Sequence, residues 1–127
     1  MATISKRILS GSTDGFPITV SSTAISGTTL HVGPTSTNTM DRLTVYAFNS
    51  ATVTVTLWAE WGNAGSASQR LSFEVAPYGS GITHDGLQCI IPGLLIQGRS
   101  ATGASIMVGA STSMVIQLYG EVDRIVQ

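Results

Sequence analysis

Two histidines, one cysteine and seven carboxylates are the side chains of this 127-residue chain that could support catalysis or bind a metal. His31 and His84 stand far apart in the sequence and no second cysteine accompanies them, whereas a zinc site needs three or four ligands. A site that used both histidines would have to recruit carboxylates from unrelated loops. The pattern therefore favours a histidine in a strand and a histidine in a turn over a metal site.

The carboxylates are Asp14, Asp41, Glu60, Glu74, Asp85, Glu121 and Asp123. Glu121 and Asp123 would share one face of a strand, and such a pair can do acid–base chemistry when burial raises the pKa of one member. Arg124 is adjacent, so we expect a solvated edge or an interface salt bridge instead. Cys89 lies in an apolar run, which favours a small buried hydrophobic residue over a nucleophile.

Two further patterns have the form of binding motifs. The segment 79–84 begins like a dinucleotide fingerprint, but His84 replaces the third glycine and no βαβ pattern surrounds it. Trp58 and Trp61 face opposite ways if they share a strand, so they do not form a platform for stacking a sugar. We expect one of them in the core and the other at a rim or interface. The sequence thus predicts no catalytic residues, no cofactor and no metal site.

Alternating side chains in the centre of the chain indicate strands. In residues 43–48 the side chains alternate between the two faces of an extended strand, and each face carries large residues. Asn49-Ser50, which follows, is typical of a turn. The run Thr52–Leu57 then alternates threonine with valine and leucine, which predicts a half-buried strand with a threonine face. We expect these two runs to form an antiparallel hairpin.

The rest of the chain continues this pattern of short strands. Further strands are predicted at 70–75, 87–91, 94–97, 106–108 and 114–119, with Pro92-Gly93 stopping the second of these. No window of eleven residues shows the apolar spacing of a helix. The predicted fold is all-β: a single-domain antiparallel β-sandwich, jelly-roll-like.

Small and hydroxyl residues dominate the composition, since Ser, Thr and Gly make up 46 of the 127 residues. Half of the 32 Ser and Thr residues fall within residues 1–40, a stretch with three charges and several Gly and Pro interruptions. We therefore expect residues 1–40 to form an extended Ser/Thr-rich N-terminal arm or peripheral strands. Residues 41–127 are expected to form the core of the β-sandwich.

Charge is scarce, and its scarcity argues against several classes of function. Only 13 residues are charged and the net charge is −1, so the chain lacks the basic patch of nucleic-acid-binding proteins. No apolar run reaches the length of a transmembrane helix, and residues 1–10 do not have the pattern of a secretory signal. A surface with so little charge is typical of a protein covered by partners.

A few residues are candidates for contact with such partners. Arginine is favoured for ion pairs at interfaces, tryptophan is enriched there, and a threonine-faced strand can lie against another sheet. The candidate interface residues are Lys6, Arg7, Thr52, Thr54, Thr56, Trp61, Arg99 and Arg124.

Several segments taken in order resemble a known group of proteins. The matching segments are 9–18, 27–31, 59–62, 94–101 and the ending Gly120–Ile125. Together they resemble small tailed-bacteriophage virion proteins of the capsid decoration (cement) type. The resemblance implies a β-sandwich on the outer surface of the capsid, most often a homotrimer, that clamps neighbouring subunits of the major capsid protein. It implies no catalytic residues.

Two alternatives stay open. The chain could be another virion component, at the head–tail connector, neck or tail tip, and the number of copies per particle separates this reading from decoration. It could instead be a carbohydrate-binding or adhesin module, which would need an exposed pair of aromatic side chains on one surface.

Overall fold

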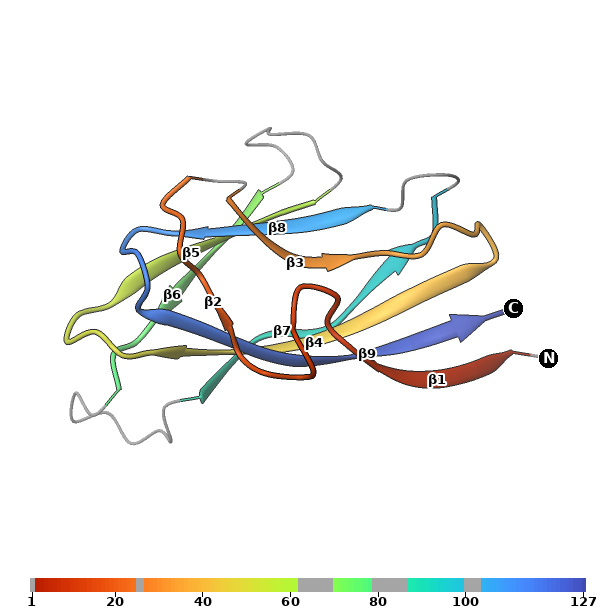
Figure 1. Ribbon diagram of the computed structural model, residues 1–127, viewed down its shortest axis with the longest axis horizontal. Helices are drawn as coiled ribbons and strands as arrows, with labels where there is room; N and C mark the ends of the chain where they lie inside the picture. The colour runs from red at the N-terminus through yellow and green to blue at the C-terminus, as the bar shows by residue number, and fades with distance from the viewer. Residues whose placement is uncertain (1, 25–26, 62–69, 79–86, 100–103) are drawn as a thin grey trace.

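Two antiparallel β-sheets face each other across a hydrophobic core in the computed structural model (Figure 1). The structure describes residues 2–24, 27–61, 70–78, 87–99 and 104–127, and of Trp61 the backbone only. The strands within these residues are β1 (Thr3–Ile8), β2 (Ile18–Thr19), β3 (Thr28–Val32), β4 (Thr39–Asn49), β5 (Val55–Trp61), β6 (Arg70–Val75), β7 (Leu87–Gln97), β8 (Ser105–Ala110) and β9 (Ile116–Val126).

The first sheet has the strand order β1-β9-β4-β7, with β2 also paired to β9, and the second has the order β3-β8-β5-β6. All pairings are antiparallel. β1 and β2 lie one after the other along the same edge of β9. These findings confirm the predicted all-β sandwich. Among the described residues there is no helix with the length and hydropathy needed to span a membrane.

The core follows from the two-residue period of the strands. Alternate residues of β4 point inward, and Leu43, Val45 and Ala47 are fully buried there. Leu57 and Ala59 of β5 are buried from the opposite sheet, and both sets belong to one hydrophobic cluster. Burial of apolar surface between the sheets is the main stabilising contribution in such a fold.

Before β4 begins at Thr39, the described residues hold three strands, each at the edge of a sheet: β1 and β2 along β9, and β3 along β8. All six residues of β1 are exposed. The segments that follow β1 do enter the core, through Leu9, Ile18 and Val20. The division of the chain at residue 40 stays a prediction.

The predicted hairpin between residues 43–48 and 52–57 is wrong, because the two strands belong to different sheets. Asn49 explains the change of direction. It is fully buried at the end of β4, and its side-chain amide donates to the carbonyl oxygens of Val53 and Val75 at 2.9 Å each. These bonds hold the connection as it crosses from the first sheet to the second.

The predicted strand Thr52–Leu57 is also wrong in its beginning. β5 starts at Val55, so Thr52 and Thr54 precede it and only Thr56 of the three threonines lies in the strand. The prediction that Pro92-Gly93 ends a strand is also wrong. A single strand, β7, runs from Leu87 to Gln97 and includes both residues. β7 is an edge strand, where proline is tolerated, and its pairing with β4 shifts register nearby.

Candidate functional site

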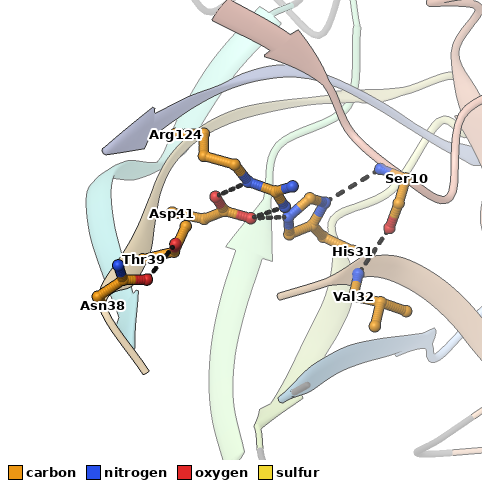
Figure 2. Close-up of polar contacts among 7 residues, drawn as sticks. All are labelled: Ser10, His31, Val32, Asn38, Thr39, Asp41 and Arg124. Carbon is orange, nitrogen blue, oxygen red and sulfur yellow. Dashed lines mark hydrogen bonds and ion pairs between the residues drawn. The ribbon is translucent and has the colours of Figure 1, made fainter. Parts of the chain in front are cut away.

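Asp41 is a fully buried carboxylate with a partner for each oxygen. It occupies an inward position of β4, two residues before Leu43. The Arg124 guanidinium on β9 donates from Nε to Oδ1 and from Nη2 to Oδ2, at 2.8 Å each (Figure 2). The Nε2 atom of His31 on β3 lies 2.7 Å from the same Oδ2. Asp41 thus joins both sheets through charged and polar contacts.

The second ring nitrogen of His31 is also occupied. The Ser10 backbone N–H donates to Nδ1 at 3.0 Å, so Nδ1 must be the acceptor and Nε2–H the donor toward Asp41. The Ser10 hydroxyl accepts from the Val32 backbone N–H at 2.6 Å (Figure 2). Residue 10 therefore contacts β3 twice, beside the buried histidine.

The ionised state of Asp41 follows from its contacts. Burial by itself would raise its pKa, but the hydrogen bonds from Arg124 and His31 outweigh this and lower the pKa below its ordinary value. The hydrogen bonds to Asp41 in turn raise the pKa of Arg124. The pair is therefore a carboxylate and a guanidinium throughout the physiological pH range.

Serine, histidine and aspartate together have the composition of a hydrolase triad, but the geometry here differs. In a triad the imidazole takes a proton from the serine hydroxyl through a free ring nitrogen. Here the lone pair of Nδ1 accepts the Ser10 amide and Nε2 faces Asp41. The arrangement suits the joining of chain segments rather than proton transfer from a hydroxyl nucleophile.

A glycine allows the N-terminal segment to approach β3 this closely. The Gly11 N–H donates to the Leu30 carbonyl oxygen at 3.1 Å. A Cβ atom at residue 11 would lie 2.1 Å from the Thr29 carbonyl oxygen, well inside contact distance. Only glycine fits between these two backbones.

Beside the buried cluster is a hollow of about 440 Å³, within the size range of small-ligand sites. Its lining residues are Arg7, Ile8, Ser10, His31, Val32 and Arg124. Ser5 on β1 lies opposite Arg124 on β9 and therefore shares its face of the sheet. Arg7 is two residues farther along β1, so it lies on that same face. Among the described residues Arg7 has no ion-pair partner.

A second ion-paired group lies on the outer face of the same sheet. Lys6 Nζ is 2.9 Å from Asp123 Oδ1 and 3.3 Å from Glu121 Oε1. Hydrogen bonds to these two carboxylates, Asp123 first, raise the pKa of Lys6. Glu121 and Asp123 do not lie at an edge of the sheet, because β9 is flanked by β1 and β4, and their ion-pair partner among the described residues is Lys6. The expectation of an interface salt bridge stays a prediction.

Uncharged aromatic and apolar side chains gather farther along this outer face. Tyr46 on β4 lies directly opposite Tyr119 on β9 and opposite Cys89 on β7. The Phe48 ring contacts the Tyr78 ring, with centroids 5.3 Å apart. We call this surface the tyrosine face, and its residues are Tyr46, Phe48, Tyr78, Leu87, Cys89 and Tyr119. All but the half-buried Phe48 are exposed.

The structure brings two of the candidate interface residues together, since Arg7 and Arg124 line the same hollow. Lys6 lies on the opposite face of β1 from Arg7. Arg99 is exposed after β7, where its backbone N–H donates to the Pro34 carbonyl oxygen.

The threonine candidates fall elsewhere. Thr52 and Thr54 are exposed ahead of β5, and Thr56 donates to Glu74 on β6. Trp61 ends β5, and its side chain lies outside the described residues, as do His84 and the segment 79–84. The expectation that Cys89 is buried is wrong, because the outward positions of β7 leave its thiol exposed.

Sequence reasoning did not single out Asp41, yet the sequence holds a signal for it. Asp41 stands two residues before Leu43 and four before Val45, which places it in the buried set of the same alternation. Glu60 is a second buried carboxylate, 1% exposed. The residues that the structure describes hold no group of three or more His, Cys, Asp or Glu side chains able to bind a metal ion.

No protein-family model and no curated protein matches the chain. Among solved structures, it is similar to the insecticidal delta-endotoxin Cry8Ea1 from Bacillus thuringiensis, with a TM-score of 0.43 and 13% sequence identity. The match covers 85% of this chain but 19% of the toxin chain, so the chain spans about a fifth of that protein. A similarity of this size supports no inference about function.

Proposed function

We propose that this protein is a non-enzymatic structural protein of a tailed-phage virion that decorates the outer surface of the capsid. In this role it clamps neighbouring subunits of the major capsid protein and assembles as a homotrimer. The proposal begins from the ordered resemblance of segments 9–18, 27–31, 59–62, 94–101 and 120–125 to decoration proteins. The strand orders β2-β9-β4-β7 and β3-β8-β5-β6 support a jelly-roll arrangement for it, since most connections pass between the sheets.

The observation that carries the proposal is the tyrosine face. Its six side chains are uncharged. Five of them lie on the adjacent strands β9, β4 and β7, and Tyr78, in the segment after β6, contacts Phe48. Exposed apolar patches on soluble proteins mark interaction sites, and tyrosine and phenylalanine are enriched at protein interfaces while charged residues are depleted. We assign this face to contact with the capsid.

The open edge of β1 adds a second kind of contact. β1 pairs with β9 along one edge, and no described strand pairs with its other edge. An unpaired edge offers backbone N–H and carbonyl groups to an extended segment of another protein. Such contacts need no charge, which agrees with the low charge of the whole chain.

The test mixes the purified protein with undecorated heads and images the particles by electron microscopy. We expect density on the head lattice at hundreds of copies per particle. We expect the double variant Tyr46→Ser/Tyr119→Ser to bind at least 10-fold more weakly. Leu71→Ser is the matched control, because Leu71 is 51% exposed on β6 of the other sheet. Absence of wild-type binding would overturn the proposal, and a dozen or fewer copies would favour a connector or tail component.

The tyrosine pair also favours one function of another class. Tyr46 and Tyr119 are 39% and 37% exposed and directly opposite each other, so their rings could stack on a carbohydrate. A carbohydrate-binding or adhesin module is therefore the second candidate. Titration with bacterial surface glycans, read by the fluorescence of the native protein and of Tyr46→Ser/Tyr119→Ser, separates the two functions.

A further inference from the structure

We propose that Arg7 and Arg124 form a binding site for a carboxylate side chain, an Asp or Glu presented by a neighbouring capsid protein subunit. The ligand site is the hollow of about 440 Å³ at the side of the buried Asp41 cluster. The identity of the partner rests on the proposed function. The recognition of a carboxylate rests on the geometry of the site alone.

Arg124 keeps donors available for a ligand. A guanidinium has five N–H donors, and Asp41 takes the one on Nε and one on Nη2. The remaining N–H groups belong to a side chain that lines the hollow and is 24% exposed. Asp41 also fixes the guanidinium plane, so these donors are oriented before a ligand arrives.

Arg7 supplies the second positive group. It lines the same hollow from β1, and among the described residues it has no ion-pair partner. Two guanidinium groups beside one hollow are suited to carboxylate recognition, because each presents a planar fork of donors. Among the described residues at this site, no carboxylate compensates the charge of Arg7.

The charge balance favours a carboxylate over a phosphate. Arg7 and Arg124 contribute two positive charges and Asp41 contributes one negative charge. The His31 ring adds no charge, because Nδ1 accepts from the Ser10 N–H and only Nε2 carries a proton. The net charge of the site is therefore +1, which matches a carboxylate. A phosphate dianion would exceed this charge and would lie close to ionised Asp41.

The walls of the hollow favour a carboxylate carried on a short aliphatic stem. Ile8 and Val32 line the hollow and are 51% and 37% exposed. Val32 offers apolar contact to methylene groups, while Ser10 adds a polar group at the rim. An Asp or Glu side chain combines these two chemistries, whereas an inorganic anion has no apolar part.

The first experiment titrates the purified protein with propionate, a monocarboxylate with a short aliphatic stem, and follows the arginine Nε–Hε signals by NMR. We expect saturable shifts at Arg7 and Arg124, and at least 10-fold weaker binding in Arg7→Ala. Arg42→Ala is the matched control, because Arg42 is exposed on the outer face of the same sheet. Equal shifts at all arginines, no shifts, or tighter binding of inorganic phosphate than of propionate would overturn the site.

The second experiment tests the partner with undecorated heads. We expect Arg7→Glu to lose head binding by at least 10-fold and Arg7→Lys to retain more of it, since lysine preserves the charge. If wild-type protein binds heads and Arg7→Glu binds equally well, the capsid partner is wrong and the proposed function stands. If wild-type protein binds no heads, the proposed function falls, and the propionate titration still tests the site.

Discussion

Two ion-paired groups lie on opposite faces of β9, at the neighbouring residues Asp123 and Arg124. On the inner face Arg124 binds Asp41, whose side chain is fully buried. On the outer face Asp123 binds Lys6, whose side chain is 69% exposed. The distances are almost equal, at 2.8 and 2.9 Å. The inner pair is bidentate and the outer one is not, but the larger difference between them is exposure to solvent.

Burial changes what each pair contributes. Water screens an exposed pair and competes for its hydrogen bonds, so the pair adds little to stability. A buried pair has already lost its hydration, so removal of one partner leaves a charge with no compensation. The inner group should therefore be essential to the fold and the outer group dispensable.

The largest expected effect is that of Asp41→Asn. This substitution leaves the Arg124 guanidinium without its carboxylate, and we expect the free energy of unfolding to fall by about 3–5 kcal/mol. Denaturation in guanidinium chloride at pH 7 measures the loss. Asp123→Asn is the matched control one strand over, and a loss equal to that of Asp41→Asn would contradict the comparison.

A smaller effect is expected from His31→Phe, which keeps a ring of similar size and removes both hydrogen bonds of the imidazole. The Ser10 N–H then has no acceptor, and we expect a loss of about 1–3 kcal/mol in the same denaturation experiment. Ser10→Ala removes only the hydroxyl that accepts from the exposed Val32 N–H. It should cost less than His31→Phe, and the reverse order would refute the assigned hydrogen bonds.

The pH dependence of stability should carry the signature of Asp41. Its pKa in the folded protein is lowered, while the unfolded chain titrates near the ordinary value of about 3.9. As the pH falls through this value, the unfolded state takes up the proton first, so the contribution of Asp41 to stability declines. It is complete above the ordinary pKa and is lost as the pH passes below the folded pKa.

Denaturation midpoints measured between pH 7 and pH 2 check this expectation. Wild-type protein should lose stability more steeply below about pH 4 than Asp41→Asn does, because the variant lacks the titrating group. Parallel curves for the two proteins would show that Asp41 does not contribute in this way.

The smallest expected effect is that of Lys6→Ala. Lys6 is exposed and its two carboxylate partners can be hydrated in its place, so the denaturation midpoint should not change beyond experimental error. Addition of salt should leave the difference between wild type and variant unchanged. A clear loss of stability would show that β1 is held on β9 by this ion pair.

The fold was predictable where a local pattern decides it. The alternation of residues 43–48 predicts the inward and outward sets of β4, and the same alternation extends back to Asp41. The partner strands were not predictable, because pairing depends on where the chain turns. Asn49 was expected in a tight turn, yet its amide binds two carbonyl oxygens and directs the chain to the other sheet.

The candidate site was predictable only in part. Arg124 and Arg7 were singled out because arginine is favoured in interface ion pairs, and both line the hollow. The pairing of β4 with β9 brings Arg124 to Asp41, 83 positions away, and the packing of the two sheets brings His31 to the same carboxylate. The tyrosine face has the same origin, because Tyr46 meets Tyr119 only through the pairing of β4 with β9.

The central place of β9 has a consequence for synthesis on the ribosome. β9 lies between β4 and the first two strands, and Arg124 supplies the guanidinium for Asp41. Until residues 116–126 leave the exit tunnel, β1 and β2 have no partner strand and the Asp41 carboxylate has no counter-charge. The first sheet of the nascent chain is therefore expected to stay open until β9 emerges, and then to close in one cooperative step.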